Sequence, residues 1–125
     1  SMTFWNWRHN IDGYRYGGKI MGNTVRTITD PDLDMYRHHL ESEEKSRATT
    51  EKYIRDVKAL KTYIGNQSIT KGLIIAYKNH LQNHYKATRI NSMLAGINSF
   101  LTFMGWQEYR VKQLVFPLQK SFLTI

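Results

Sequence analysis

The feature that most constrains the fold is an apolar stripe with helical spacing between residues 88 and 105. Its members are Ile90, Met93, Leu94, Ile97, Phe100, Leu101 and Met104. Apolar side chains three and four residues apart share one face of an α-helix, and that face must be buried against other elements. The stripe therefore predicts a helix from about Thr88 to Gly105, where glycine ends it.

Three further segments show the same periodicity, and the first and third of them have a Ser, Thr or Asp near the start as a cap. In the first, Pro31 suits the first helical position, and Gly65 stops the second. They cover about residues 30–44, 48–64 and 68–81. Four amphipathic helices with short connections predict an all-α bundle.

The remaining segments carry weaker patterns. Residues 1–28 mix aromatic residues with glycines and show no helical period, so we expect an irregular arm or a short β-hairpin. The helical domain is expected over residues 29–113. Val111 to Phe116 adds a short helix, which would be the fifth, or an extended tail.

Length and composition exclude several classes of protein. A chain of 125 residues supports one domain. It has no cysteine, which removes disulfide scaffolds and thiol chemistry. No run approaches the roughly 18 apolar residues of a membrane span, and the start does not read as a secretion signal. We expect a cytoplasmic protein without a membrane partner.

The net charge of +8 favours a polyanionic partner, and its distribution sharpens that expectation. Residues 1–44 hold five basic and seven acidic side chains, whereas residues 45–125 hold thirteen basic and three acidic ones. The helical segment after Glu44 is therefore the expected binding lobe.

Polar and basic residues gather at two predicted helix starts. A helix N-terminus offers N–H groups and a partial positive charge, and adjacent cations and hydroxyls complete the chemistry of phosphate contact. The first group is Lys45, Arg47, Thr49 and Lys52, with Arg55 one turn further on; the second is Lys86, Thr88, Arg89, Asn91 and Ser92.

The polar face of the last helix carries no charge. It consists of Thr88, Asn91, Ser92, Ala95, Asn98, Ser99 and Thr102. Short amide and hydroxyl side chains suit close approach to another surface. That surface is either the floor of a DNA groove or a neighbouring helix or domain.

Patterns for catalysis or a metal site do not accumulate. His80 and His84 have metal-ligand spacing, but no third ligand accompanies them, so we expect two polar histidines and no metal site. The carboxylates cluster near helix ends, where capping and solvation explain them. Phosphate-loop and nucleophile-elbow motifs do not occur, so no cofactor and no catalytic residue are expected.

The stretches 45–60 and 87–106 resemble the second and fourth helices of the core-binding domain of tyrosine recombinases of the phage-integrase type. In the first stretch Thr49, Tyr53 and Arg55-Asp56 match the family pattern. In the second stretch the matching residues are Arg89, Asn91, Leu94, Phe100 and Met104-Gly105. The likeness covers about residues 30–116. It departs from the pattern at Ser92 and near Asn98, where the family often has basic residues.

The resemblance implies an orthogonal, SAM-like bundle that closes on double-stranded DNA together with a C-terminal catalytic domain and other recombinase protomers. The second and fourth helices would lie against the major groove, with Asn91, Ser92 or Lys52 nearest base edges. The catalytic domain of the family forms a 3′-phosphotyrosyl link and carries an H-x-x-R motif. No histidine here has arginine three residues later. We expect residues 114–125 to begin a linker to a catalytic domain absent from this chain.

Two other functions remain open at this stage. The uncharged face of the last helix is compatible with a helical protein–protein interaction module that does not bind DNA. A nucleotide-handling enzyme is disfavoured by the missing phosphate loop and metal triad.

Overall fold

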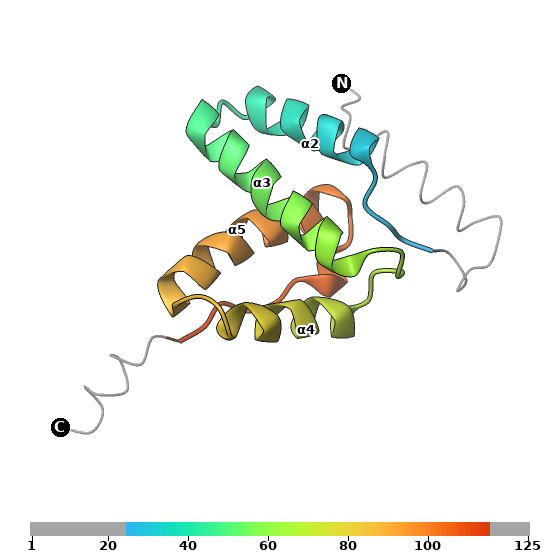
Figure 1. The fold of residues 1–125 in the computed structure, drawn as a ribbon. Helices are drawn as coiled ribbons and strands as arrows, with labels where there is room; N and C mark the ends of the chain where they lie inside the picture. Colours follow the sequence, from blue (N-terminus) through green and yellow to red (C-terminus); the bar gives the residue numbers. More distant parts are fainter. Residues whose placement is uncertain (1–24, 116–125) are drawn as a thin grey trace.

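The computed structural model describes residues 25–115, which form four α-helices and one 3₁₀ turn (Figure 1). In chain order these are α2 (Asp30–Ser42), α3 (Arg47–Ile64), α4 (Lys71–Gln82), α5 (Ala87–Phe103) and the 3₁₀ helix η1 (Gln107–Tyr109). No strand occurs within this described range. The predicted all-α bundle is confirmed. Most of the predicted N-terminal arm, residues 1–24, lies outside the residues that the structure describes.

Local capping chemistry sets the helix starts. Thr29 and Asp32 form a reciprocal capping box at α2, in which the Thr29 hydroxyl accepts from the Asp32 amide and the Asp32 carboxylate accepts from the Thr29 amide. The Ser46 hydroxyl accepts from the Thr49 amide, so α3 begins at Arg47, slightly before the predicted position. Thr70 caps α4 in the same way.

The end of α5 is a sharp reversal. Gly105 has a φ of +79°, a left-handed conformation that favours glycine. The Trp106 amide donates to the Leu101 carbonyl and the Gly105 amide to the Thr102 carbonyl, which is the pair of bonds of a Schellman motif. The chain then forms η1, which was not predicted, and turns back along α5 (Figure 1).

Helix α5 is the central element of the bundle. It crosses α3 steeply and lies between the α2–α3 pair and α4 (Figure 1). Its apolar stripe is buried as predicted from the sequence. The core joins all four helices and includes Tyr36, Leu40, Ile54, Val57, Leu60, Ile74, Leu81, Leu94, Ile97, Phe100 and Trp106.

The segment from Arg110 to Val115 contains no helix or strand, and it runs as an extended chain from Arg110 onward (Figure 1), one of the two conformations expected for this region. We call residues 110–115 the strap. It runs between α4 and α5 toward the start of α5 (Figure 1). The strap decides what the polar face of α5 contacts.

Candidate nucleic-acid interface

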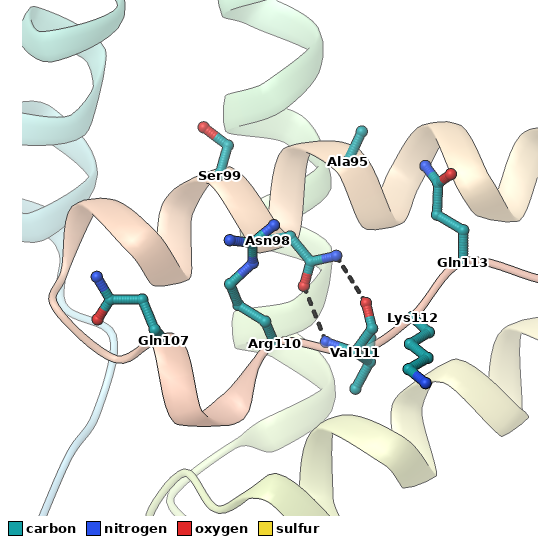
Figure 2. A pocket seen from close by; sticks show the side chains of 8 residues that line it. All are labelled: Ala95, Asn98, Ser99, Gln107, Arg110, Val111, Lys112 and Gln113. Atoms are coloured by element: carbon teal, nitrogen blue, oxygen red, sulfur yellow. Dashed lines mark hydrogen bonds between the residues drawn. The ribbon is translucent and has the colours of Figure 1, made fainter.

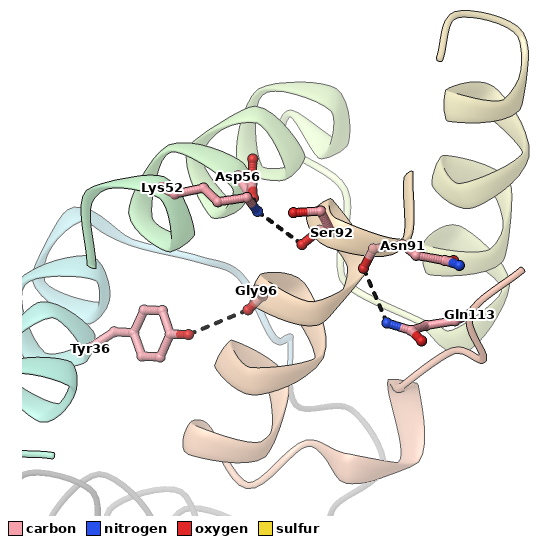
Figure 3. A network of polar contacts seen from close by, with 7 residues as sticks. All are labelled: Tyr36, Lys52, Asp56, Asn91, Ser92, Gly96 and Gln113. Atoms are coloured by element: carbon pink, nitrogen blue, oxygen red, sulfur yellow. Dashed lines mark hydrogen bonds and ion pairs between the residues drawn. The ribbon is translucent and has the colours of Figure 1, made fainter. Parts of the chain in front are cut away.

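Lys52 joins the two helices that carry the predicted site residues. Its ammonium group donates to the Asp56 carboxylate at 2.5 Å and to the Ser92 carbonyl oxygen of α5 at 2.9 Å (Figure 3). Two residues predicted separately, Lys52 and Ser92, are therefore in direct contact. Because Lys52 lies early in α3 and Ser92 early in α5, this bond joins the first half of α3 to the first half of α5.

The cations around these two helix starts are accessible. Those with exposed side chains are Lys45, Arg47, Arg55, Lys86 and Arg89, while Lys52 is half-buried. The Arg89 guanidinium lies 4.7 Å from the ring centroid of Tyr85, itself an exposed aromatic residue. Such stacking holds a guanidinium in place without neutralising it. Arg89 thus keeps its full charge at the surface.

The start of α5 is better suited to an anion than the start of α3. Lys86 occupies the N-cap position of α5 without a side-chain cap, and the first turn contains no acidic residue. The first-turn N–H groups and the positive end of the helix dipole therefore lie beside Lys86, Arg89 and the exposed hydroxyl of Thr88.

At the start of α3 the charges are mixed. Ser46 caps the helix and also donates its hydroxyl to the Thr49 hydroxyl at 3.0 Å. Glu51 forms an ion pair with Arg37 and lines the same surface hollow, of about 440 Å³, as Lys45 and Arg47. The acidic group weakens the positive potential there, so the two helix starts are not equivalent.

Asn91 differs from the other predicted residues because its side chain already has partners. Its amide group exchanges two hydrogen bonds with the backbone of Leu114 in the strap. The main-chain carbonyl oxygen of Asn91 accepts from the Gln113 side chain at 3.2 Å (Figure 3). The Asn91 amide is therefore directed at the chain's own strap.

Asn98 is held in the same way and is buried. It exchanges two bonds with the backbone of Val111 at the side of an open pocket of about 760 Å³ (Figure 2). Arg110 and Lys112 on either side of Val111 also line this pocket, and both residues are exposed. Sequence reasoning did not select these two cations, because only the reversal at Gly105 brings them beside α5.

The face of α5 that includes its polar residues thus contacts three neighbours: α2, α3 and the strap. Ser99 accepts a hydrogen bond from Tyr36 of α2, and Gly96 lies against Tyr53 of α3. Asn91 and Asn98 face the strap. The sequence left two alternatives for the surface that this face contacts, a DNA groove or a neighbouring helix or domain. In the structure, other segments of the same chain contact much of the face.

The histidine pair lies in a separate hollow of about 660 Å³ between α3, α4 and the start of α5. The rings of His80 and His84 are 4.7 Å apart, with Tyr63 and Tyr77 beside His80. Burial raises the pKa of the Tyr77 phenol to about 12. Within residues 25–115, no cluster of three or more His, Asp or Glu side chains is placed to hold a metal ion.

Comparison with known proteins identifies one relationship. The sequence model of the phage integrase N-terminal SAM-like domain matches residues 33–108, which include α3, α4, α5 and most of α2. No curated protein and no solved structure matches the chain significantly. None of the helices in the described range is long and apolar enough to cross a membrane.

Proposed function

Since the chain belongs to the family of phage integrase N-terminal SAM-like domains, we propose that it binds the double-stranded DNA on which a recombinase acts. It is the non-catalytic N-terminal domain of an integrase. In the proposed role it positions the duplex and a separate C-terminal catalytic domain performs strand transfer, with other recombinase protomers on the same DNA. Such work would take place on DNA in the cytoplasm.

The observation that carries the proposal is the bond between Lys52 and Ser92. It joins the second turn of α3 to the second turn of α5, and in the proposal the two groups of cations, separated by about forty residues of sequence, contact the same duplex. A duplex presents phosphates along both edges of its major groove. Cations at the starts of two helices that are joined through Lys52 and Ser92 would match that repetition of charge.

Each part of the surface has a role in the proposal. Lys86 and Arg89, with the first-turn N–H groups of α5, contact one phosphate region. The second region is contacted from α3 and the turn before it by Lys45, Arg47, Arg55 and the hydroxyl of Thr49. Thr88 adds a hydroxyl at α5, while Lys52 and Ser92 lie between the two regions and closest to base edges.

The test is the salt dependence of DNA binding, measured by fluorescence anisotropy on a labelled duplex. We expect a Kd of roughly 10⁻⁴–10⁻⁶ M for a non-specific duplex, with affinity falling steeply as salt rises. Arg89→Ala and Lys86→Ala should each weaken binding and reduce the salt slope by about one. Both residues are exposed, so their removal leaves the core intact.

A matched control is Lys61→Ala, which removes the same charge further along α3. Lys61 lies 3.9 Å from Asp30 and not at either helix start. It should leave the slope almost unchanged. Equal effects of Lys61→Ala and Arg89→Ala would indicate only diffuse attraction, and an absence of binding near 50 mM salt would refute the proposal.

The protein-interaction module remains the second candidate, but less of the uncharged face of α5 is available for a partner than the sequence suggested. Part of the uncharged face of α5 is covered by the strap and by Tyr36. Indifference of DNA binding to the loss of Arg89 and Lys86 would favour that module.

A further inference from the structure

Two asparagines of α5 grip the main chain of the strap. Asn98 donates from Nδ2 to the Val111 carbonyl oxygen at 2.8 Å, and its Oδ1 accepts from the Val111 amide at 3.0 Å (Figure 2). Asn91 repeats this arrangement on Leu114, donating at 3.0 Å and accepting at 2.6 Å. Each side chain offers the strap the donor and acceptor that an adjacent β-strand would offer.

The spacing of the two asparagines fits an extended chain. Asn91 and Asn98 are seven residues apart on a helix, which corresponds to about 10.5 Å along its axis. Val111 and Leu114 are three residues apart, which corresponds to about 10 Å in an extended segment. A helical or compact segment would be too short to reach both amides. The pair therefore selects the conformation of the strap as well as its register.

Helix α4 holds the other side of the strap. The ammonium groups of Lys71 and Lys78 donate to the carbonyl oxygens of Arg110 and Lys112. All of these bonds, like those of the asparagines, are made to main-chain atoms. The groove between α4 and α5 thus binds the strap through its backbone, with Val111 as its one buried side chain.

We propose that Asn91 and Asn98 are positioning residues that fix where the chain leaves the domain. Leu114 is held by Asn91, one turn into α5, so the strap ends near the N-terminal end of α5, the end that carries Lys86 and Arg89. The chain after the strap therefore starts next to the surface that we assign to DNA. The statement that the chain leaves next to a DNA-binding surface rests on the proposed function, whereas the hydrogen bonds that Asn91 and Asn98 make to the strap do not.

The same bonds assign the Asn91 amide to the strap instead of a base. An asparagine that reads adenine uses one N–H donor and the carbonyl acceptor together. Asn91 already directs that pair at Leu114. Reading a base would require the strap to leave.

Amide hydrogen exchange of the Asn91→Asp variant tests whether the Asn91 side chain holds the strap at Leu114. At neutral pH the ionised side chain has no donor and faces the Leu114 carbonyl, so the protection factor of the Leu114 amide should fall at least roughly tenfold. Below the carboxyl pKa of about 4, a protonated side chain again has a donor and an acceptor, so protection should return. Asparagine itself does not titrate, and the wild type should show no such transition.

Two internal controls accompany this measurement. The Val111 amide, held by Asn98, should stay protected throughout and reports that the domain is folded. Ser92→Ala, an exposed change at the next residue, should leave Leu114 protected. Unchanged protection of Leu114 in Asn91→Asp at neutral pH, or its failure to return at low pH while Val111 stays protected, would overturn the assignment.

A DNA-binding measurement separates this inference from the proposed function. Asn91→Ala should bind duplex DNA within about twofold of the wild type, because the amide is not a base contact. A loss above tenfold on one DNA sequence only would assign Asn91 to a base edge and overturn the inference. If the wild type itself does not bind DNA, the proposed function is refuted, and so is the statement that the strap ends next to a DNA-binding surface. The exchange data would still show whether Asn91 holds the strap.

Discussion

The phenol of Tyr36 on α2 donates a 2.8 Å hydrogen bond to the hydroxyl of Ser99 on α5. Tyr36 is fully buried, and burial raises the pKa of its phenol. The bond reaches across the bundle to the uncharged face of α5, and it explains why a short hydroxyl stands there.

Tyr36→Phe should lower the free energy of unfolding by about 1 kcal/mol, the usual net worth of one hydrogen bond. The ring contacts with Phe100 and Phe103 would remain. Urea denaturation of Tyr36→Phe, Ser99→Ala and the double variant measures the coupling between the two groups. Strict additivity would show that the hydroxyl pair does not stabilise the fold.

Gly96→Ala should destabilise the domain by about 1–3 kcal/mol, as overpacking does. A Cβ at Gly96 would lie 3.2 Å from the ring of Tyr53, where α3 and α5 cross. Gly72→Ala is the matched control in α4, since the nearest atom to its Cβ would be 3.8 Å away. There the better helix propensity of alanine should raise stability by up to about 1 kcal/mol. Thermal unfolding of both variants checks the contrast.

Lys52→Met should cost about 1–3 kcal/mol, because the nearly buried carboxylate of Asp56 loses its cation. Adding Asp56→Asn should recover most of that loss by removing the stranded charge. DNA affinity should stay low in both variants, since the cation between the helix starts is missing. Paired denaturation and anisotropy titrations separate the two effects. Recovery of DNA binding in the double variant would show that Lys52 acts only through stability.

Stability should fall as pH rises from about 10 to about 12. The pKa of Tyr77 is about 12 in the folded protein against 10 in the unfolded chain, so the folded state retains a proton that the unfolded state releases in this window. The stabilisation is complete below pH 10 and is lost as pH passes through the folded pKa. Tyr77→Phe should therefore show a shallower loss of Tm over this range. Parallel Tm curves for both proteins would contradict this explanation.

The helices were predictable because their signals are local. Thr29, Ser46 and Gly105 act within a few residues of themselves, and the stripe from Ile90 to Met104 needs no knowledge of its partner. The cations at both helix starts were predictable for the same reason, and the structure brings Lys52 and Ser92 together.

The partners of polar side chains were not predictable. Asn91 and Asn98 have the composition of a DNA-reading face, and nothing in the sequence says that Leu114 and Val111 occupy them. That pairing depends on the left-handed turn at Gly105 and the extra turn of η1, which together set the return path of the chain. Arg110 and Lys112 were missed because their position follows from that path.

The direction of the strap also determines how this domain connects to the rest of the chain. The Ile69 amide, just before α4, donates to the Arg26 carbonyl oxygen, which anchors the incoming chain at one end of that helix. The outgoing chain passes Lys78 in the second half of α4, a helix that spans about 18 Å. Arg26 and Lys112 are thus held at different points along α4, so one helix separates the segment that enters the described domain from the segment that leaves it.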